Sequence, residues 1–582
     1  MVLKDCLEIF KKEMERAAGD SGNLDRLILD SYVPAEGIYL IVKEDGSIGY
    51  PEEIKMDKKT RELEYIPSTY EQICFYDYHS RLVSMDKPQD PKKVIHSNNY
   101  LSFWVKQESL QNGKLNEEAI DRYFDVLCNP REKYSKPKDR EMYDYIAGQL
   151  GEINQEKLER NRKWIKEHIF TLEDLGVTLT GKNYLKIFFE DEDDGYLREE
   201  QRYLITKIFN KNDYNIKIGG EILGLPNDNL GLNQKKPYME NRTRKITVPY
   251  LVTSEEAVLQ RKFFDYLMNQ AVKGEVNLFF DMEGKRILSR KKGEMIERDF
   301  SGFYLQVRKG KEVEIWHQDV IVDYRYYLKK KFSYQNVLQL PDKGEIYKNY
   351  GVKKELQAVI DDVVFFKWLI PNYFTPADEM QADGELKRSL LWARDAIFAW
   401  LYKGQEKNIG RIMEQVCMNM TKSSIQNGFI PKAGKQFNLM CSLKEYFSGG
   451  KQMADRYCNI KDELRSKINQ KETDQIKSDE EYFYAVGQLV NYFISLNKSK
   501  EKVHSLANPF FNAKNDEIIK EKLRQYFMKY NYQLNFNGRR FNRLYEMVCG
   551  YVPGEKVDQT TIIAGYLSSN LIYESKKEEE EQ

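Results

Sequence analysis

The sequence predicts an α+β protein: a mixed α/β N-terminal body over residues 1–345, followed by a C-terminal α-helical region over residues 346–582. Up to about residue 340, short apolar runs bounded by turn residues alternate with helical patterns. From about Tyr347, apolar residues recur at helical spacing almost without interruption. A chain of 582 residues is long enough for roughly two to four domains.

The N-terminal body opens with a charged amphipathic helix predicted over residues 1–16. A second charged helix is predicted over residues 154–168, and Glu283-Gly284 forms a hairpin turn. Residues 227–245, called the motif loop below, form a long polar loop, and a loop of that length is more often functional than idle. Strands are predicted at residues 38–42, 73–78, 185–189, 276–280, 303–307 and 320–324.

In the C-terminal region, residues 386–401 have a strong apolar helical period. Ser478 and Glu481 are spaced as a capping box, which opens a helix that buries residues 483, 486, 490 and 493. Residues 516–530 carry an apolar stripe, formed by Ile519, Leu523, Phe527 and Tyr530. The tail over residues 576–582 contains four glutamates and is expected to be disordered.

The charges balance overall, with 91 basic and 91 acidic residues, so an electrostatic partner must meet a local patch. The seven cysteines are widely spaced without a CxxC pair, which argues against structural zinc and against a disulfide framework. The sequence has neither a signal-peptide pattern nor an apolar run of transmembrane length. We therefore expect a cytoplasmic protein without a membrane partner.

Catalytic patterns are absent from the sequence. The five histidines never pair at metal-ligand spacing. Residues 176–183 spell GxxxxGK followed by Asn, so the hydroxyl of a P-loop is missing, and we interpret them as a turn before a strand at Tyr184. The acidic residues 190–194 are interpreted as a solvated cluster. We expect no enzymatic activity, no cofactor and no metal, although spacing alone does not exclude a triad assembled by the fold.

The stretch from Lys498 to Arg543 is basic, with eleven Lys or Arg against four acidic residues and with eight Phe or Tyr interleaved. Cationic groups set among aromatic and amide side chains are typical of a nucleic-acid surface. The alternative is a solvated helix face with extended lysine stems.

Three parts of the chain resemble the large subunit of the subtype I-B CRISPR interference complex, Cascade. The first is KKVIHSNNY at residues 92–100, and the second is NQKKPY at residues 233–238, running on to Pro249. The third part comprises SDEEYFYAVGQ at 478–488, HSLANPF at 504–510, RFNR at 540–543 and AGYLSSN at 564–570. The likeness covers nearly the whole length, is densest at the C-terminus, and depends on the order and spacing of the segments.

The resemblance implies a non-catalytic, prokaryotic DNA-recognition subunit that serves antiviral defence. Such a subunit lies near the 5′ end of the guide RNA, recognises the protospacer-adjacent motif, helps open the target and stabilises the R-loop. Its implied partners are the CRISPR guide RNA, target double-stranded DNA, the Cascade backbone and guide-end subunits, small subunit copies and the recruited helicase-nuclease.

The motif loop is the first choice for contact with the duplex beside the target. Its amides can read base edges, and its cations can meet phosphates. The alternative is a surface loop whose basic residues meet solvent or a neighbouring subunit. The candidate residues are Asn227, Asn229, Asn233, Gln234, Lys235, Lys236, Asn241, Arg242, Arg244 and Lys245.

Two further segments are second choices for DNA or RNA contact. In the first, Lys92, Lys93, Asn98 and Asn99 either contact nucleic acid or belong to a strand-turn whose Asn side chains cap the backbone. The second is a basic hairpin that enters a groove as a wedge or is simply a soluble turn. It contains Lys285, Arg286, Arg290, Lys291 and Lys292.

In the helical region, eight cations are candidates for tracking the target or displaced strand, and their contacts are expected to be sequence-independent and salt-sensitive. Charge reversal at Arg539, Arg540 and Arg543 is expected to weaken DNA binding on every sequence alike. The eight residues are Lys514, Lys520, Lys522, Arg524, Lys529, Arg539, Arg540 and Arg543.

The resemblance also implies that residues 453–582, a small-subunit-like bundle, are made separately from an internal start. The codons of Gly449-Gly450 can spell a ribosome-binding element shortly ahead of Met453, and Met440 is a second possible start.

Two other classes of function compete with this interpretation. One is a helical interaction scaffold without direct nucleic-acid contact, whose basic patches serve protein partners. The other is a nuclease whose acidic or histidine residues are brought together only by the fold.

Overall fold

The computed structural model describes residues 2–57, 63–82, 88–179, 181–226, 251–310, 312–341, 344–382, 384–449, 453–470, 474–497, 503–534, 538–554 and 556–574. The structure is 54% helix and 15% strand, with sheets in the N-terminal region and a run of helices at the C-terminus, which confirms the predicted α+β class. Two compact units are present. Unit 1 contains Met1–Lys291 and Gly302–Val320, and unit 2 contains Lys292–Ser301 and Ile321–Gln582, so residue 345 lies inside unit 2.

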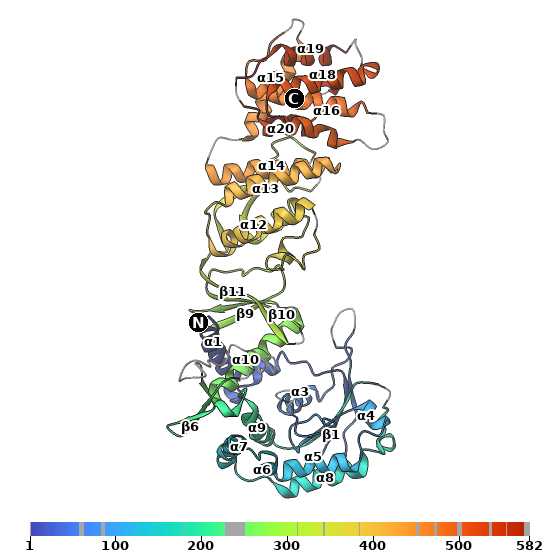
Figure 1. The fold of residues 1–582 in the computed structure, drawn as a ribbon, viewed down its shortest axis with the longest axis vertical. Coiled ribbons are helices and arrows are strands. Elements are labelled where there is room, and N and C mark those ends of the chain that lie inside the picture. The colour runs from blue at the N-terminus through green and yellow to red at the C-terminus, as the bar shows by residue number, and fades with distance from the viewer. Residues whose placement is uncertain are drawn as a thin grey trace. The chain divides into compact units, whose positions relative to one another are not determined.

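The first sheet of unit 1 has the strand order β2-β1-β4-β3. Its central strands β1 (Gly37–Val42) and β4 (Tyr184–Phe189) pair in parallel, and β2 (Glu52–Ile54) and β3 (Ser102–Lys106) flank them in antiparallel pairs. Almost every residue of β1 and β4 is buried, and because strand side chains alternate between faces, both faces of the sheet are covered. Helices α5 (Glu117–Cys128) and α8 (Gln155–His168) lie side by side and share this core (Figure 1).

The prediction of a strand at residues 73–78 is wrong, because these residues form part of helix α3 (Tyr70–His79). Every residue from 73 to 79 is buried, so the segment lacks the polar face that marks an amphipathic helix. A short apolar run of this kind has no period that separates a buried helix from a buried strand.

The other five predicted strands are confirmed by β1, β4, β8 (Asn277–Asp281), β10 (Phe300–Lys309) and β11 (Val313–Tyr324). The second sheet has the order β11-β10-β8-β9, and the predicted turn at Glu283-Gly284 joins β8 to β9 (Arg286–Arg290). Helices α1 (Val2–Ala18) and α10 (Ser254–Lys273) contribute to the core cluster beside β8 and β10. The remaining elements of unit 1 include α6 (Pro130–Lys133), α7 (Pro137–Leu150), α9 (Asp193–Leu204) and a small sheet of β5 (Ile216–Ile218), β6 (Glu221–Gly224) and β7 (Val252–Thr253).

Unit 2 begins its regular structure with the antiparallel pair β12 (Tyr327–Ser333) and β13 (Asn349–Val352). The helical run therefore starts at α11 (Lys353–Val363), slightly later than the predicted start near Tyr347. The predicted helix at residues 386–401 is confirmed by α12 (Gly384–Lys403), and α13 (Ile409–Gln426) packs along α14 (Ile430–Ser448). The C-terminal bundle, residues 453–574, contains α15 (Met453–Asn469), α16 (Asp479–Ser495), α17 (Asn508–Phe511), α18 (Asp516–Tyr530), α19 (Arg539–Gly550) and α20 (Gln559–Leu567) (Figure 1).

Helix α16 is the central helix of the C-terminal bundle, and it contacts α15, α18, α19 and α20. Its N-cap is Ser478 as predicted, since the Ser478 hydroxyl accepts from the backbone N–H of Glu481 at 3.2 Å. The return bond of the capping box differs from the prediction. The buried Glu481 carboxylate accepts from the Lys477 backbone N–H at 2.8 Å and from Lys467 Nζ at 2.5 Å.

Two glycines set the distance between α16 and α20. A Cβ atom at Gly487 would lie 2.1 Å from the carbonyl oxygen of Ile562, and one at Gly565 would lie 2.1 Å from that of Tyr484. The neighbouring Gln488 then bridges the helices, because its amide donates to the Gly565 carbonyl at 2.6 Å and accepts from the Leu571 N–H at 2.8 Å.

Substitution Gly487→Ala is expected to destabilise the C-terminal bundle by about 3 kcal/mol or more, because two helix backbones would have to move apart. Urea unfolding of the full chain measures the loss. Gly550→Ala is the matched control, since a Cβ atom there meets no atom within 4 Å. Equal stability of the two variants would contradict the close helix crossing.

Candidate nucleic-acid interface

The motif loop, including all ten of its candidate residues from Asn227 to Lys245, lies outside the described residues. Its role in reading the motif duplex therefore stays a prediction. The acidic tail over residues 576–582 also lies outside the described part of the chain.

The segment over residues 92–100 is held by a buried aspartate. The Asp90 carboxylate accepts from the backbone N–H groups of Lys92 at 3.0 Å and Val94 at 2.7 Å, and from Arg122 Nε at 3.0 Å. The side chains of Lys92 and Lys93 remain exposed, and Lys93 adopts a left-handed backbone with φ of 58°. Both lysines are thus available for a ligand, on a backbone that Asp90 holds in place.

The two asparagines of the same segment are buried and bonded to the protein. Asn98 Nδ2 donates to the carbonyl of Arg81 at 2.8 Å. Asn99 Oδ1 accepts from the Leu101 backbone N–H at 3.0 Å and from the Ser102 hydroxyl at 3.1 Å. This is the arrangement expected from the alternative interpretation, in which the asparagines cap backbone groups.

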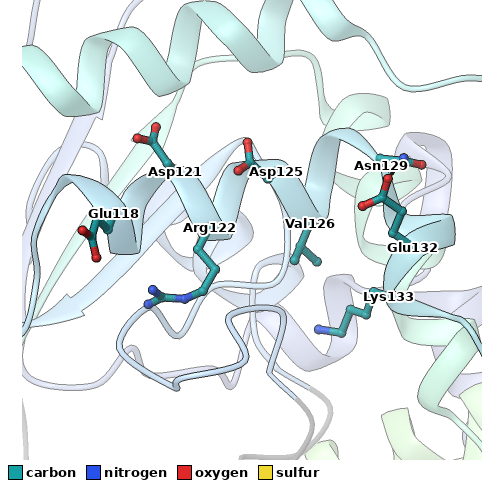
Figure 2. Close-up of a pocket in the computed structure, with 8 residues that line it drawn as sticks. All are labelled: Glu118, Asp121, Arg122, Asp125, Val126, Asn129, Glu132 and Lys133. Atoms are coloured by element: carbon teal, nitrogen blue, oxygen red, sulfur yellow. Dashed lines mark hydrogen bonds between the residues drawn. The ribbon is translucent and has the colours of Figure 1, made fainter.

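A depression of about 410 Å³ on α5 and α6 is lined by further residues that hold the segment over residues 92–100 in place. In Figure 2, Arg122 and Lys133 point toward the loop that precedes β3, whereas Asp121 and Asp125 point away from it. Lys133 Nζ donates to the carbonyls of Pro88 at 2.6 Å and Gln89 at 2.8 Å. Because Arg122 and Lys133 are already bonded to this loop, the residues of the depression hold the loop in position.

The basic hairpin does not gather its five cations at one tip. Lys285 and Arg286 lie at the turn, whereas Arg290 ends strand β9 and Lys291 and Lys292 follow it. The turn is fastened to α1, since the Arg16 guanidinium donates to the carbonyls of Gly284 and Lys285, both at 3.2 Å. Only Lys285 and Arg286 are therefore placed to act together as a wedge.

In the C-terminal bundle, the three candidate arginines of α19 bind the C-terminal end of α15. Arg539 donates to the carbonyl of Gln470 at 3.0 Å, and Arg543 donates to that of Ile468 at 3.4 Å. Arg540 Nε donates to Asn469 Oδ1 at 2.7 Å, and its guanidinium also donates to the Glu574 carbonyl. The last carbonyls of a helix have no partner within the helix, so Arg539 and Arg543 act as a cap supplied by a second helix, whereas Arg540 links the Asn469 side chain to Glu574.

The remaining five candidates lie on or beside α18 and differ in exposure. Lys520 is half-buried, pairs with Asp516 at 2.9 Å and donates to the Tyr551 carbonyl at 2.5 Å. Arg524 is 71% exposed and lies 3.5 Å from Glu521. Lys514 and Lys529 are exposed, and Lys522, at the rim of the buried face, donates to Gln525 Oε1 at 3.0 Å. We call Lys514, Lys522, Arg524 and Lys529 the α18 cations.

The predicted apolar stripe explains why the α18 cations face outward. Ile519, Leu523 and Tyr530 are buried, and Tyr526 is buried beside them. Helical spacing then places Lys522 and Lys529 one above the other along one edge of this stripe, with Gln525 between them. The exposed Glu517 and Glu521 lie on the same helix, so the four cations retain a positive excess of two.

Within the described ranges, no group of three His, Cys, Asp or Glu side chains is arranged to hold a metal ion. Nor does any helix in those ranges combine the length and apolarity needed to cross a membrane.

The C-terminal segments of the resemblance are packing segments. Residues 478–488 begin α16, and residues 564–570 form the end of α20, so the two segments meet at the glycine crossing. His504 Nδ1 is 2.7 Å from the Tyr566 hydroxyl, which ties residues 504–510 to the same helix. Comparison of the chain with protein-family models and with curated proteins found no match.

Substitution Arg540→Ala is expected to lower the stability of the C-terminal bundle by ~1–3 kcal/mol, because it removes the bonds that join α19 to the Asn469 side chain and the Glu574 carbonyl. Arg524→Ala is the matched control, and it should stay within ~0.5 kcal/mol of the parent chain, as expected for an exposed side chain. Urea unfolding distinguishes the two outcomes. Similar stabilities would mean that the α19 arginines are not structural.

Proposed function

We propose that the protein is the non-catalytic large subunit of a CRISPR RNA-guided surveillance complex of the Cascade type, subtype I-B, in the cytoplasm of a prokaryote. In this role it recognises the protospacer-adjacent motif, helps open target DNA, stabilises the R-loop and recruits the helicase-nuclease for antiviral defence. Its partners are the guide RNA, target duplex, backbone and guide-end subunits, and small subunit copies.

The observation that carries the proposal is the outward-facing set of α18 cations. No ion pair joins Lys514, Lys522 or Lys529 to another described residue. Each can therefore meet a phosphate without first breaking an ion pair, although Lys522 gives up one hydrogen bond to Gln525 and Lys529 lies over the Tyr530 ring, 5.2 Å from its centroid. Such cations, with an amide at Gln525 and the exposed ring of Tyr532 at the end of the helix, suit sequence-independent contact with a nucleic-acid strand.

The sequence likeness supports the same proposal independently. Its segments occur in the order and spacing of the Cascade large subunit and extend along both units. The structure adds the expected class of architecture, in which an N-terminal region with sheets precedes a helical C-terminal region.

The helical scaffold remains the second candidate, because one observation favours it. Arg539, Arg540 and Arg543, three of the eight candidate cations, are bonded to the C-terminal end of α15. Charge reversal at these three residues would weaken DNA binding through loss of structure alone. The test of nucleic-acid contact must therefore use the α18 cations.

The combined variant Lys514→Glu, Lys522→Glu and Lys529→Glu is expected to weaken binding of the assembled complex to target DNA on every sequence alike. Each lost phosphate contact should reduce the slope of log affinity against log salt by about 0.7 to 0.9. Filter binding at several salt concentrations measures both quantities.

A double variant of exposed lysines in unit 1, Lys114→Glu and Lys163→Glu, is the matched control. If the triple variant keeps both the affinity and the salt slope of the parent complex, α18 is not a nucleic-acid surface and the scaffold is favoured. Crosslinking the assembled complex to a target duplex then shows whether any part of the chain touches DNA.

Translation from Met453 is expected to produce a second, shorter product. Helix α15 begins at Met453, so residues 453–582 include all the helices of the C-terminal bundle. Immunoblotting of a C-terminally tagged gene should reveal a full-length band and a shorter band. Met453→Leu should remove the shorter band, whereas Met440→Leu should retain it; a lone full-length band from the parent gene would rule out the second product.

A further inference from the structure

A second cleft in unit 1 is lined by lysines. It has a volume of about 800 Å³ and lies between the loop before β3, helix α6, the start of α7 and the segment that follows α9. Acidic residues also line it, namely Glu132, Asp139 and Asp213, but the cations are more numerous. We call this site the lysine cleft, after Lys93, Lys133, Lys136, Lys207 and Lys211.

The charges of the lysine cleft favour an anion. A concave surface with an excess of one sign concentrates the field in its interior. Asp139 is already engaged, since its Oδ1 accepts from Asn212 Nδ2 at 2.8 Å. Lys136 is exposed at the N-cap of α7, where the positive end of the helix dipole adds to the attraction.

A buried donor in the cleft lacks a partner. Asn210 is 6% exposed, and its Nδ2 has no hydrogen-bond partner among the described residues. The backbone N–H of Asn210 donates to the Leu225 carbonyl at 2.8 Å, which fixes the residue. A buried polar group left without a partner costs about 1–3 kcal/mol of free energy. A ligand that supplies an acceptor to this group removes that cost, which favours binding of the ligand.

Lys133 lines this cleft and also belongs to the group of residues that holds residues 92–100 in place. Its ammonium group donates to the carbonyls of Pro88 and Gln89, and burial lowers the pKa of Lys133 to about 8. An anion in the cleft would stabilise the charged form of this lysine. Lys93 lines the same cleft from a left-handed backbone position that glycine would adopt without strain.

Apolar groups supply a third type of contact. Tyr134, Phe209, Pro88 and Pro91 also line the cleft. A volume of this size, with an apolar wall and a few polar groups, is typical of sites for small ligands. The cleft thus combines cations for a phosphoryl group, a wall for a flat ring, and an amide donor for a ring or sugar acceptor.

We propose that the lysine cleft binds a nucleoside monophosphate group, either as a free nucleotide or as the terminal nucleotide of a strand. The phosphoryl group lies on the lysines, and Asn210 Nδ2 donates to an acceptor atom of the base or sugar. This assignment does not depend on the α18 cations.

Isothermal titration of the full chain tests the assignment. The probes are adenosine and uridine 5′-monophosphate, adenosine, inorganic phosphate, and a short RNA with either a 5′ phosphate or a 5′ hydroxyl. At least one monophosphate, or the 5′-phosphorylated RNA, should bind at least tenfold more tightly than its unphosphorylated counterpart and than inorganic phosphate. If the monophosphate binds more tightly, the ligand is a free nucleotide. If the 5′-phosphorylated RNA binds more tightly, the ligand is the terminal nucleotide of a strand.

Substitutions in the lysine cleft show whether the probes bind there. The double variant Lys136→Ala and Lys211→Ala should weaken the phosphorylated probe at least tenfold, and Lys93→Gly should weaken it without straining the backbone. Asn210→Ala should weaken the nucleotide but leave inorganic phosphate unaffected. Lys114→Ala is the control that should bind every probe as the parent does.

The assignment is overturned if no phosphorylated probe binds at millimolar concentration, or if the cleft variants bind as the parent does while retaining its unfolding midpoint. It is also overturned if inorganic phosphate binds as tightly as every nucleotide, since the cleft would then be an anion site only. A failure of the α18 test leaves these outcomes unchanged, so the two proposals fail separately.

Discussion

A buried network of ion pairs around α3 is the constraint on which unit 1 depends. Asp77 accepts from Lys186 Nζ of β4 at 2.5 Å and from the Tyr32 hydroxyl at 2.5 Å. His79 Nδ1 lies 2.6 Å from Glu200 of α9, and Arg81 donates to Asp265 of α10 at 2.8 Å. Removal of one partner from a buried pair costs about 3–5 kcal/mol, so the network fixes α3 against the first sheet, α9 and α10 together. Because Ser80 and Arg81 supply carbonyls to Asn98, the network also sets the position of residues 92–100, and with them one wall of the lysine cleft.

Unit 2 depends on the close approach of two helix backbones in addition to its buried ion pair between Lys467 and Glu481. The absence of side chains at Gly487 and Gly565 lets α16 and α20 approach closely enough for Gln488 of α16 to donate to the Gly565 carbonyl of α20. The segments that resemble the Cascade large subunit most densely are those that make this crossing. A likeness carried by packing residues supports the fold of the C-terminal bundle more directly than its chemistry. The chemistry rests on the α18 cations, which lie outside those segments.

Local patterns in the sequence are sufficient to predict most of the helices and strands. They are insufficient to predict most of the contacts of the candidate site. Strand β4 and helix α18 each have a clear apolar pattern, and the N-cap at Ser478 is a local property of three residues. Helix α3 was missed because burial on every side removes the period. Burial of Asn98 and Asn99, and the bond from Arg540 to the Asn469 side chain, depend on partners distant in the sequence, which no local pattern reveals. Of the lysine cleft, only Lys93 was predicted to face a ligand; Asn210 comes from a separate segment that the fold alone brings to the same site.

The eight basic candidates of the helical region show why composition is a weak guide to a nucleic-acid surface. They belong to the same residue types and one short stretch, yet the structure divides them by what their donors already bind. A guanidinium such as Arg543 that satisfies the end of a helix can reach a phosphate only by exposing a carbonyl that then needs water. An exposed ammonium such as Lys529 gives up hydration and its contact with the Tyr530 ring, and it leaves no buried group without a partner. In the proposed function, the free energy of strand binding in this region therefore comes from the α18 cations, even though the α19 arginines also contribute to the charge of the sequence.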